Sequence, residues 1–593
     1  MDLLKTKISS IYKRVKSVWP FFGFSDDSIA KSDDLDKKLV YNLSARKIPS
    51  GGQLKHLNKF LNPREFLIIK ICLLVIVLNL VYLGFGFVQK HLQYLPLAGG
   101  EYIEGVVGYP RTINPLYAVN RDVDSDLSSL VYSSLFRYDQ YGHLVNDLAD
   151  SLNISPDSKE YLVKIKDGVK WHNGGRLTAD DVLFTFNLIQ NPDYHSPLRQ
   201  NLAGVSAEKI DGTTIKFKLS EPYAPFPELL TFGILPKNLW GDISPSAAVL
   251  SDLNLKPIGS GPFKFKSLVK NSSGDLKDYY LVANDDYYGQ TPYLKTIDFK
   301  FFVDYNEAIK ALNDNQIFGL SYLPFDYRKS LLAKDSLRLH ELIQPQIVSI
   351  FFNSDKNKAL ADKNLRVALA SALDKDQIIN DVFAGSYQRA DGPLLSENWA
   401  YNDLITKYNY DPAAATAALK NKSLSIVLTV IDSGSNVAAA TKIKNYWEAV
   451  GIKVDLKIIS GEQAANIIRD RDFEALLYGE AVGGDPDVYA FWHSSQIGAK
   501  GLNLANYNNP AVDKLLVEAR GTADINERLA KYKKFQEIIT TDLPAIFLYS
   551  PSYTYPQEQQ LQGFSGTVAI EPADRFGSIS DWYLKTKKKL TWD

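Results

Sequence analysis

The segment Tyr161–Asn187, YLVKIKDGVKWHNGGRLTADDVLFTFN, contains the pattern that decides the fold of this chain. Its first residues alternate apolar and polar side chains, which predicts a half-buried strand. The glycines after Asn173 predict a turn, and Thr178 with Asp181 has the spacing of a capping box before apolar residues at helical intervals. A strand, a turn and a capped helix are therefore expected in this order.

The composition limits the class of protein. At 593 residues the chain exceeds what one hydrophobic core normally holds, so two or more lobes are expected. Its 67 basic and 68 acidic residues nearly balance, which argues against a nucleic-acid surface. The single cysteine, Cys72, lies in an apolar run. It excludes a disulfide framework and a CxxC metal or redox site.

A candidate transmembrane helix precedes the main body of the chain. Phe66–Val88 contains only Lys70 and Asn79 as strongly polar residues, and about 20 helical residues span a bilayer. Basic residues gather before the span, whereas Lys90 and His91 are the basic candidates just after it; those before it are Arg46, Lys47, Lys55, Lys59 and Arg64. The positive-inside rule then places residues 1–65 in the cytoplasm and the rest outside.

A cleaved signal peptide is the alternative to an anchor. The span begins far from Met1, and Pro96-Leu97-Ala98 has no small residue at the position required for cleavage after Ala98. We therefore favour an uncleaved anchor. Cys72 is not expected to be a lipoprotein cysteine, because the apolar run continues after it.

Three further segments flank this span. Residues 1–22 mix basic and apolar side chains, which suits either a helix on an anionic membrane surface or a plain basic tail. Residues 25–59 are polar with little periodicity and predict a disordered linker. Residues 89–100 form a short tether before a strand at Tyr102–Val107 and a helix at Asp126–Leu135.

The clearest α/β pattern lies in residues 424–459. Leu424–Val430 predicts a strand, Val437–Val450 a helix that ends at Gly451, and Ile452–Ile458 a second strand. A strand, a helix and a strand with this spacing imply a parallel pair. A further strand at Phe473–Tyr478 and helices beginning near Pro510 and Asp524 complete the α/β pattern.

Enzyme motifs are absent from the sequence. It contains no GxxxxGK[ST] phosphate loop, no HExxH and no GxSxG. The seven histidines, at 56, 91, 143, 172, 195, 340 and 493, are scattered without metal-ligand spacing. No catalytic residue, cofactor or metal site is therefore expected.

Further motifs follow the opening segment in a fixed order. They are the turn Gly259–Phe263, Asn353 with the helical stretch Asn364–Lys375, Tyr410–Pro412, Tyr446–Ile452, the triplet Asp485–Asp487 and the segment Asp542–Phe547. Together they resemble the extracytoplasmic solute-binding proteins of peptide- and nickel-type ABC importers, the oligopeptide- and dipeptide-binding family (family 5).

The resemblance implies an α/β, two-lobed fold of the periplasmic-binding-protein type (class II, cluster C). Lobe 1 would take residues 101–345 with an extra subdomain at about 146–255, lobe 2 residues 346–543, and residues 544–593 would return to lobe 1. The chain would cross between the lobes near Gln344–Asn353 and again near Asp542–Pro551. A ligand cleft between the lobes is then expected.

The resemblance also identifies candidate ligand-binding residues. Peptide-binding relatives hold the ligand's amino group with an aspartate before the triplet; here Val482 stands at that position and Gly479 at a tryptophan's. A buried ammonium needs a paired carboxylate, which Glu480 would supply if the loop shifts by two residues. Alternatively, Glu480 is an exposed acid at the end of a strand. The other candidates are Asn114, Pro115, Gly259, Gly261, Asp485, Tyr489 and Trp492, with Trp492 alternatively a core residue.

These features predict a membrane-anchored receptor that captures peptides or similar small solutes and delivers them to an ABC permease. Permease and ATPase subunits are the expected partners, because the chain has no nucleotide motif of its own. One alternative is a sensing receptor whose cytoplasmic part relays ligand occupancy, and another is a hydrolase built on the same lobes. The valine at position 482 leaves oligosaccharides, metal chelates and N-blocked peptides as alternative ligands.

Overall fold

The computed structural model describes residues 61–420 and 424–590. The predicted cytoplasmic segments 1–22 and 25–59 lie outside the described residues. The chain divides into two compact units, one spanning Leu95–Lys587 and the other containing the apolar helix near the N-terminus, and each is described by itself.

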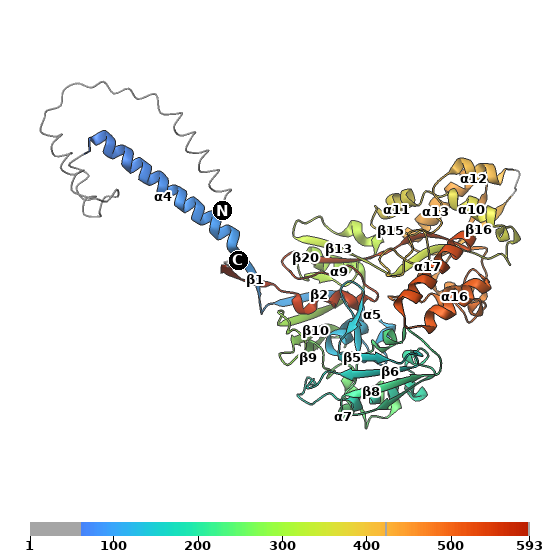
Figure 1. Cartoon of the computed structure of the whole chain (residues 1–593), viewed down its shortest axis with the longest axis horizontal. Helices are drawn as coiled ribbons and strands as arrows, with labels where there is room; N and C mark the ends of the chain where they lie inside the picture. Colours follow the sequence, from blue (N-terminus) through green and yellow to red (C-terminus); the bar gives the residue numbers. More distant parts are fainter. Residues whose placement is uncertain (1–60, 421–423, 591–593) are drawn as a thin grey trace, which may run out of the picture. The chain divides into compact units, whose positions relative to one another are not determined.

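The apolar helix α4 (Pro63–His91) contains the whole of the predicted span (Figure 1). It is long and apolar enough to cross a membrane, and none of its residues is buried. The two strongly polar side chains of the predicted span find partners within the helix: Asn79 Nδ2 donates to Val75 O at 2.8 Å, and Lys70 Nζ lies 4.6 Å from the Phe66 ring centroid. The predicted tether contains the last turn of α4 and strand β1 (Leu92–Leu97), which pairs with β21 (Lys585–Leu590).

A mixed seven-stranded sheet forms the centre of what we call lobe 1. Its central strand β2 (Glu101–Val107) runs parallel to both neighbours, and the helix α9 (Tyr305–Asn313) packs beside it. The other strands, in sheet order, are β13 (Leu337–Ile343), β20 (Ser552–Glu558) and β12 (Gly319–Leu320) on one side and β11 (Thr296–Phe302), β10 (Leu276–Ala283) and β9 (Phe263–Lys270) on the other.

The opening segment lies in a second sheet of lobe 1. Strand β6 (Glu160–Ile165) and helix α6 (Ala179–Gln190) confirm the predicted strand, turn and helix, and Thr178 and Asp181 form the capping box. The other strands of this four-stranded antiparallel sheet are β5 (Ala149–Ile154), β8 (Thr214–Leu219) and β7 (Val205–Lys209). Short elements nearby are β3 (Phe136–Tyr138), β4 (Leu144–Asn146), α7 (Lys237–Trp240) and α8 (Pro245–Ala248).

One helix of lobe 1 begins earlier than predicted. The sequence predicts Asp126–Leu135, whereas α5 spans Asp122–Val131. Asp122 and Asp124 in its first turn favour this start, since carboxylates stabilise the positive end of a helix dipole. The helix ends where the Gly259–Gly261 turn packs against its last carbonyl groups.

A six-stranded sheet forms the centre of lobe 2. The parallel pair β16 (Ser425–Ile431) and β17 (Lys453–Ile459), with α13 (Gly434–Ala449) between them in sequence, confirms the predicted α/β pattern. Gly451 has the expected left-handed backbone, at φ 93°. The remaining strands are β15 (Gln388–Arg389), β19 (Ala545–Ser550), β14 (Gln346–Phe352) and β18 (Ala475–Ala481).

Helices cover both faces of this sheet. One cluster of buried side chains lies on one face, and a second cluster lies on the other. Helices α16 (Pro510–Gly521) and α17 (Ile525–Asp542) begin where predicted and pack side by side (Figure 1). The stretch Asn364–Lys375 contains all but the first residue of helix α10 (Lys363–Ser371) and ends at Lys375, the first residue of α11 (Lys375–Phe383). The remaining helices are α12 (Pro412–Leu419), α14 (Gly461–Asp470) and α15 (Tyr489–Trp492).

The chain passes between the two sheets at two places. It leaves the seven-stranded sheet at Ile343 and enters the six-stranded sheet at Gln346, and it returns between Ser550 and Ser552. The two crossings lie close together, because Ser550 Oγ donates to Gln344 O at 2.8 Å. Motion of one lobe against the other would therefore bend two short segments.

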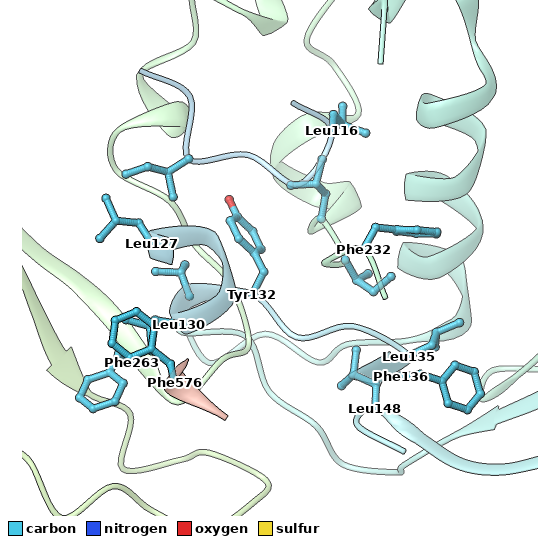
Figure 2. Packing of buried hydrophobic residues seen from close by; sticks show 14 of the residues in the cluster. Leu116, Leu127, Leu130, Tyr132, Leu135, Phe136, Leu148, Phe232, Phe263 and Phe576 are labelled. Carbon is cyan, nitrogen blue, oxygen red and sulfur yellow. The ribbon is translucent and has the colours of Figure 1, made fainter. Parts of the chain in front are cut away.

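The core of lobe 1 joins residues from distant parts of the chain. Figure 2 shows Leu127 and Leu130 of α5 with Phe263 of β9 and Phe576, which lies in the 3₁₀ helix η10 (Pro572–Phe576) near the end of the chain. Because this cluster continues into the four-stranded sheet, both sheets share one core.

Polar contacts join the motifs of each lobe. In lobe 1, His172 Nδ1 accepts the Gly259 N–H at 3.2 Å, and Nε2 faces Gly261 O at 3.1 Å. In lobe 2, Arg366 donates to the carbonyls of Asp542 and Leu543, both at 2.8 Å. These contacts give the separated motifs a structural role.

Candidate functional site

A cavity of about 600 Å³ lies in lobe 1, within the size range of small-ligand pockets. All its lining residues belong to lobe 1. Most of them come from α5 and the segment after it, from residues 228–233 and 287–290, and from η10 and the residues that flank it. These segments are far apart in sequence, so the cavity exists only in the folded chain.

The charged side chains that line the cavity are mostly acidic. The acidic residues are Asp147, Glu228, Glu571, Asp574 and Asp581, and the basic residues are Arg137 and Lys166. Asp147 and Asp581 have close polar partners, because Asp147 accepts hydrogen bonds from Ser134 N and the Tyr288 hydroxyl and Asp581 accepts from Gln290. Among the described residues, no ion pair within 4 Å involves Glu228, Glu571 or Asp574. This part of the cavity therefore has an excess of acidic groups.

Burial in the protein raises the pKa of two of these carboxyl groups. Burial, with a further contribution from the Asp485 carboxylate, raises the pKa of Glu228 to about 8. Burial and the nearby Glu571 raise the pKa of Asp574 to about 7. Both shifts have the same physical cause, since a carboxylate without water or a counter-charge is unfavourable. A cationic ligand group would remove that penalty.

A loop of lobe 2 packs against the edge of this cavity. An added Cβ at Gly484 would lie 2.8 Å from both Tyr138 Cε1 and Ile570 Cδ1, and 3.3 Å from Glu228 Oε1. Those three residues line the cavity. Only glycine allows this close approach, so the loop from lobe 2 lies directly beside the candidate site.

Ion pairs within lobe 2 hold the same loop. Asp485 accepts two hydrogen bonds from Arg528 Nη2, at 2.6 and 2.7 Å, and Asp487 accepts one from Arg520 Nη2 at 2.8 Å. Asp485 Oδ1 also accepts the Asp487 N–H at 3.0 Å. Both carboxylates of the triplet are therefore engaged by arginines of their own lobe, and Asp485 fixes the loop beside the cavity.

The candidates from lobe 1 occupy two kinds of place. Pro115 lines the cavity. Asn114 is fully buried, where its Oδ1 accepts the Leu116 N–H at 2.9 Å and its Nδ2 donates to Asn254 at 3.1 Å. An added Cβ would lie 2.0 Å from Val131 O at Gly259 and 2.5 Å from Leu130 O at Gly261. The two glycines thus allow close packing against α5.

Glu480 and Val482 lie on the edge of a lobe 2 core. Glu480, on β18, is 7% exposed, so the alternative interpretation as an exposed acid is wrong. Burial raises its pKa well above the usual value, and Arg471 is the cation that opposes this shift. Val482 is buried in the adjoining core, and its N–H donates to Pro345 O at 2.8 Å.

The two aromatic candidates differ in their surroundings. Tyr489 stacks on His493 at a centroid distance of 4.1 Å, and the Arg520 guanidinium lies 4.1 Å from its ring. Trp492 is 2% exposed and packs against Phe351 and Phe547, as its interpretation as a core residue predicts. The structure therefore places Tyr489 on Arg520 of its own lobe and Trp492 in the core of lobe 2.

Sequence reasoning missed the residues that give the site its charge and its cover. Glu228 and Asp574 belong to short 3₁₀ helices, η5 (Phe226–Leu230) and η10, and no local pattern marks either one. Gly484 lies next to the Asp485–Asp487 triplet, and the only signal was its position beside that motif.

Comparison with known proteins identifies the family. Residues 143–501 match the model of the bacterial extracellular solute-binding proteins, family 5. The chain is 30% identical to the oligopeptide-binding protein AppA of Bacillus subtilis, over 82% of this chain and 92% of AppA. It is 28% identical to the dipeptide-binding protein of Escherichia coli, over 77% of this chain and 90% of that protein.

Solved structures agree with this result. AppA from Bacillus subtilis in complex with a nonapeptide has a TM-score of 0.63 at 29% identity and covers 83% of this chain and 100% of its own. The substrate-binding protein CtaP of Listeria monocytogenes has a TM-score of 0.72 at 30% identity and covers 82% of this chain and 99% of its own. The expected two-lobed α/β fold is thus confirmed, and the chain belongs to the family 5 extracellular solute-binding proteins of ABC importers.

Proposed function

We propose that this chain is a membrane-anchored receptor that captures peptides in the cavity of lobe 1, beside the Gly484 loop of lobe 2, and delivers them to an ABC permease and its ATPase subunits. The observation that carries the proposal is the 600 Å³ cavity of lobe 1, whose acidic edge is covered by the Gly484 loop of lobe 2. A ligand that reaches from this cavity to the Gly484 loop at its edge would contact both lobes and favour the closed state by its differential affinity.

The charge of the cavity supports a ligand with a free amino group. Val482 stands where peptide-binding relatives have their amine-binding aspartate, but Glu228, Glu571 and Asp574 supply carboxyl groups from lobe 1. We propose that the ligand's ammonium group pairs with Glu228. Asn114, Gly259, Gly261, Glu480 and Trp492 then act through packing, whereas Pro115, Asp485 and Tyr489 shape the cavity edge and the contact between the lobes.

Attachment by α4 is part of the proposal. The helix is longer than the roughly 20 residues needed to span a bilayer, and Lys70 and Asn79 within the apolar span find partners in the helix itself. With the basic residues before it on the cytoplasmic side, Leu95–Lys587 would lie outside the cell. We propose that this chain, like the related solute-binding proteins, binds its solute without catalysing a reaction on it.

The test begins with the ligand. The full chain is purified in detergent, any co-purified solute is identified by native mass spectrometry, and mixed free-amine and N-acetylated peptides are compared by thermal shift. A ligand at 100 times its Kd should stabilise the fold by about 2.7 kcal/mol. If no peptide changes Tm and another solute does, the proposal of a peptide ligand is wrong.

The role of Glu228 has its own test. Because its pKa in the unliganded chain is about 8, pairing with an ammonium should release a proton at pH 7. Calorimetry in buffers of different ionisation enthalpy measures that release. Glu228→Gln should abolish this proton release. It should also weaken the binding of free-amine peptides by about 30-fold or more, as expected when one partner of a buried charge pair is removed. Glu221→Gln, an exposed acid that does not line the cavity, is the matched control.

A further inference from the structure

Arg520 occupies a position that the proposed ligand site does not explain. It lies at the end of α16 in lobe 2, and its guanidinium carbon is 4.1 Å from the ring centroid of Tyr489 in its own lobe. The ring centroid of Tyr223, in lobe 1, is 5.0 Å from the same carbon. The cation therefore lies between aromatic rings from both lobes, at distances typical of cation–π contacts.

The main chain adds a second contact at the same place. Ala224 N donates to Arg520 O at 2.7 Å, so a residue of lobe 1 forms a backbone hydrogen bond with a residue of lobe 2. Pro222 lies 4.0 Å from the position that a Cβ on Gly521 would occupy. Residues 222–224 of lobe 1 and 520–521 of lobe 2 thus form a small, packed contact between the lobes.

The lobe 2 half of this contact is held in place by its own lobe. Arg520 Nη2 lies 2.8 Å from Asp487 Oδ2, and the Asp487 side chain is 8% exposed. An arginine that is already oriented by a buried carboxylate loses little further freedom when a ring packs on its open face. The guanidinium is thus prepared to receive Tyr223 before the lobes meet.

We propose that Arg520 is a positioning residue that holds the two lobes together when no solute is bound. Arg520, Tyr223 and Ala224 do not line the cavity, so their contact needs no ligand. It follows that the empty receptor populates the closed arrangement and that bound solute adds to a pre-existing bias. The inference rests on the proposed function only in taking closure as the event that the solute favours.

Distances between the lobes of the ligand-free protein test the proposal directly. Spin labels on Ser206→Cys in β7 and Thr441→Cys in α13, both exposed positions, report the separation of the lobes in the full chain in lipid nanodiscs. Cys72, the only native cysteine, is replaced by serine. Pulsed dipolar spectroscopy then gives the ratio of closed to open molecules without any ligand.

Removing the ring should open the protein. Tyr223→Ala is expected to lower the closed-to-open ratio by about tenfold, the value of a partly desolvated cation–π contact. Tyr223→Phe keeps the ring and should keep the closed population, whereas Arg520→Met should behave like the alanine variant. Arg469→Met, which removes an exposed arginine paired with Asp470, is the matched control and should change nothing.

Three results would overturn the proposal. The first is an unchanged distance distribution in Tyr223→Ala. The second is an equal opening in Tyr223→Phe, which would show that the ring is not the relevant group. A fall in Tm of Tyr223→Ala that matches the opening would assign the residue a structural role instead. Because no ligand is present, failure here would leave the proposed solute-binding function intact, which thermal shifts with peptides test separately.

Discussion

Arg575 allows a sharp test of how lobe 1 is held together. Its guanidinium is fully buried, with Nη1 and Nη2 at 2.6 and 2.7 Å from the two carboxylate oxygens of Asp126 and Nε at 3.1 Å from Glu104 Oε1. Glu104 Oε2 also accepts the Tyr102 and Tyr555 hydroxyls, at 2.7 and 3.0 Å. One cation thus joins β2, α5, β20 and η10, and two of these elements, α5 and η10, form walls of the cavity.

Replacing Arg575 by methionine would leave two carboxylates in the interior without a counter-charge. Breaking a buried ion pair by removing one partner costs about 3–5 kcal/mol. A cooperative unit of about 150–250 residues loses about 2–4 °C of Tm per kcal/mol. We therefore expect the Tm of Arg575→Met to fall by about 6 °C or more, measured by the tryptophan fluorescence of the full chain in detergent during heating.

A combined variant separates charge from packing. Arg575→Met together with Glu104→Gln and Asp126→Asn removes all three charges but keeps polar groups beside the tyrosines. We expect it to regain at least half of the lost Tm, since replacing a whole buried ion network is often close to neutral. Arg469→Met, at an exposed pair, should stay within about 1 °C of wild type. An Arg575→Met chain that unfolds at the wild-type temperature would refute this reasoning.

Two further predictions concern pH. Burial lowers the pKa of His172 from 6.5 to about 4. The unfolded chain therefore binds a proton between these values that the folded chain does not, and stability should fall as pH drops through this window; His172→Asn should flatten the decrease of Tm from pH 7 to pH 4.5. Burial, and then Asp278, raise the pKa of Asp298 to about 7, and its Oδ1 has no hydrogen-bond partner among the described residues. Stability should therefore fall as pH rises from about 4 to 7, and Asp298→Asn should raise Tm more at pH 8 than at pH 5. An equal gain at both values would count against the assignment.

Local elements followed from local patterns. The strand, turn and capped helix of residues 161–187, the β16–α13–β17 unit and the start of α17 after Asp524 were predictable, because alternation, capping and turn residues act within a few positions of the chain. Helix α5 was displaced from its predicted position by four residues at each end; acidic residues in its first turn favour the earlier start, and packing of the Gly259–Gly261 turn from far along the chain fixes its end.

The candidate site shows the opposite relation. Its acidic edge joins Glu228 with Glu571 and Asp574, and its cover comes from Gly484 in the other lobe. No spacing in the sequence connects these positions. The resemblance predicted that the amine-binding aspartate is absent at Val482, but nothing in the sequence predicted the carboxyl groups of lobe 1 that compensate in our proposal.

The amino-acid order alone thus specified the family, the α/β class and the apolar helix, because motifs, periodicity and hydropathy are properties of contiguous residues. Folding alone decided which charges share the cavity, which arginines hold the Asp485–Asp487 loop and where the lobes touch. The physical reason is that electrostatic and packing energies depend on distance in space, and a chain that crosses twice between its lobes brings distant residues within a few ångströms of one another.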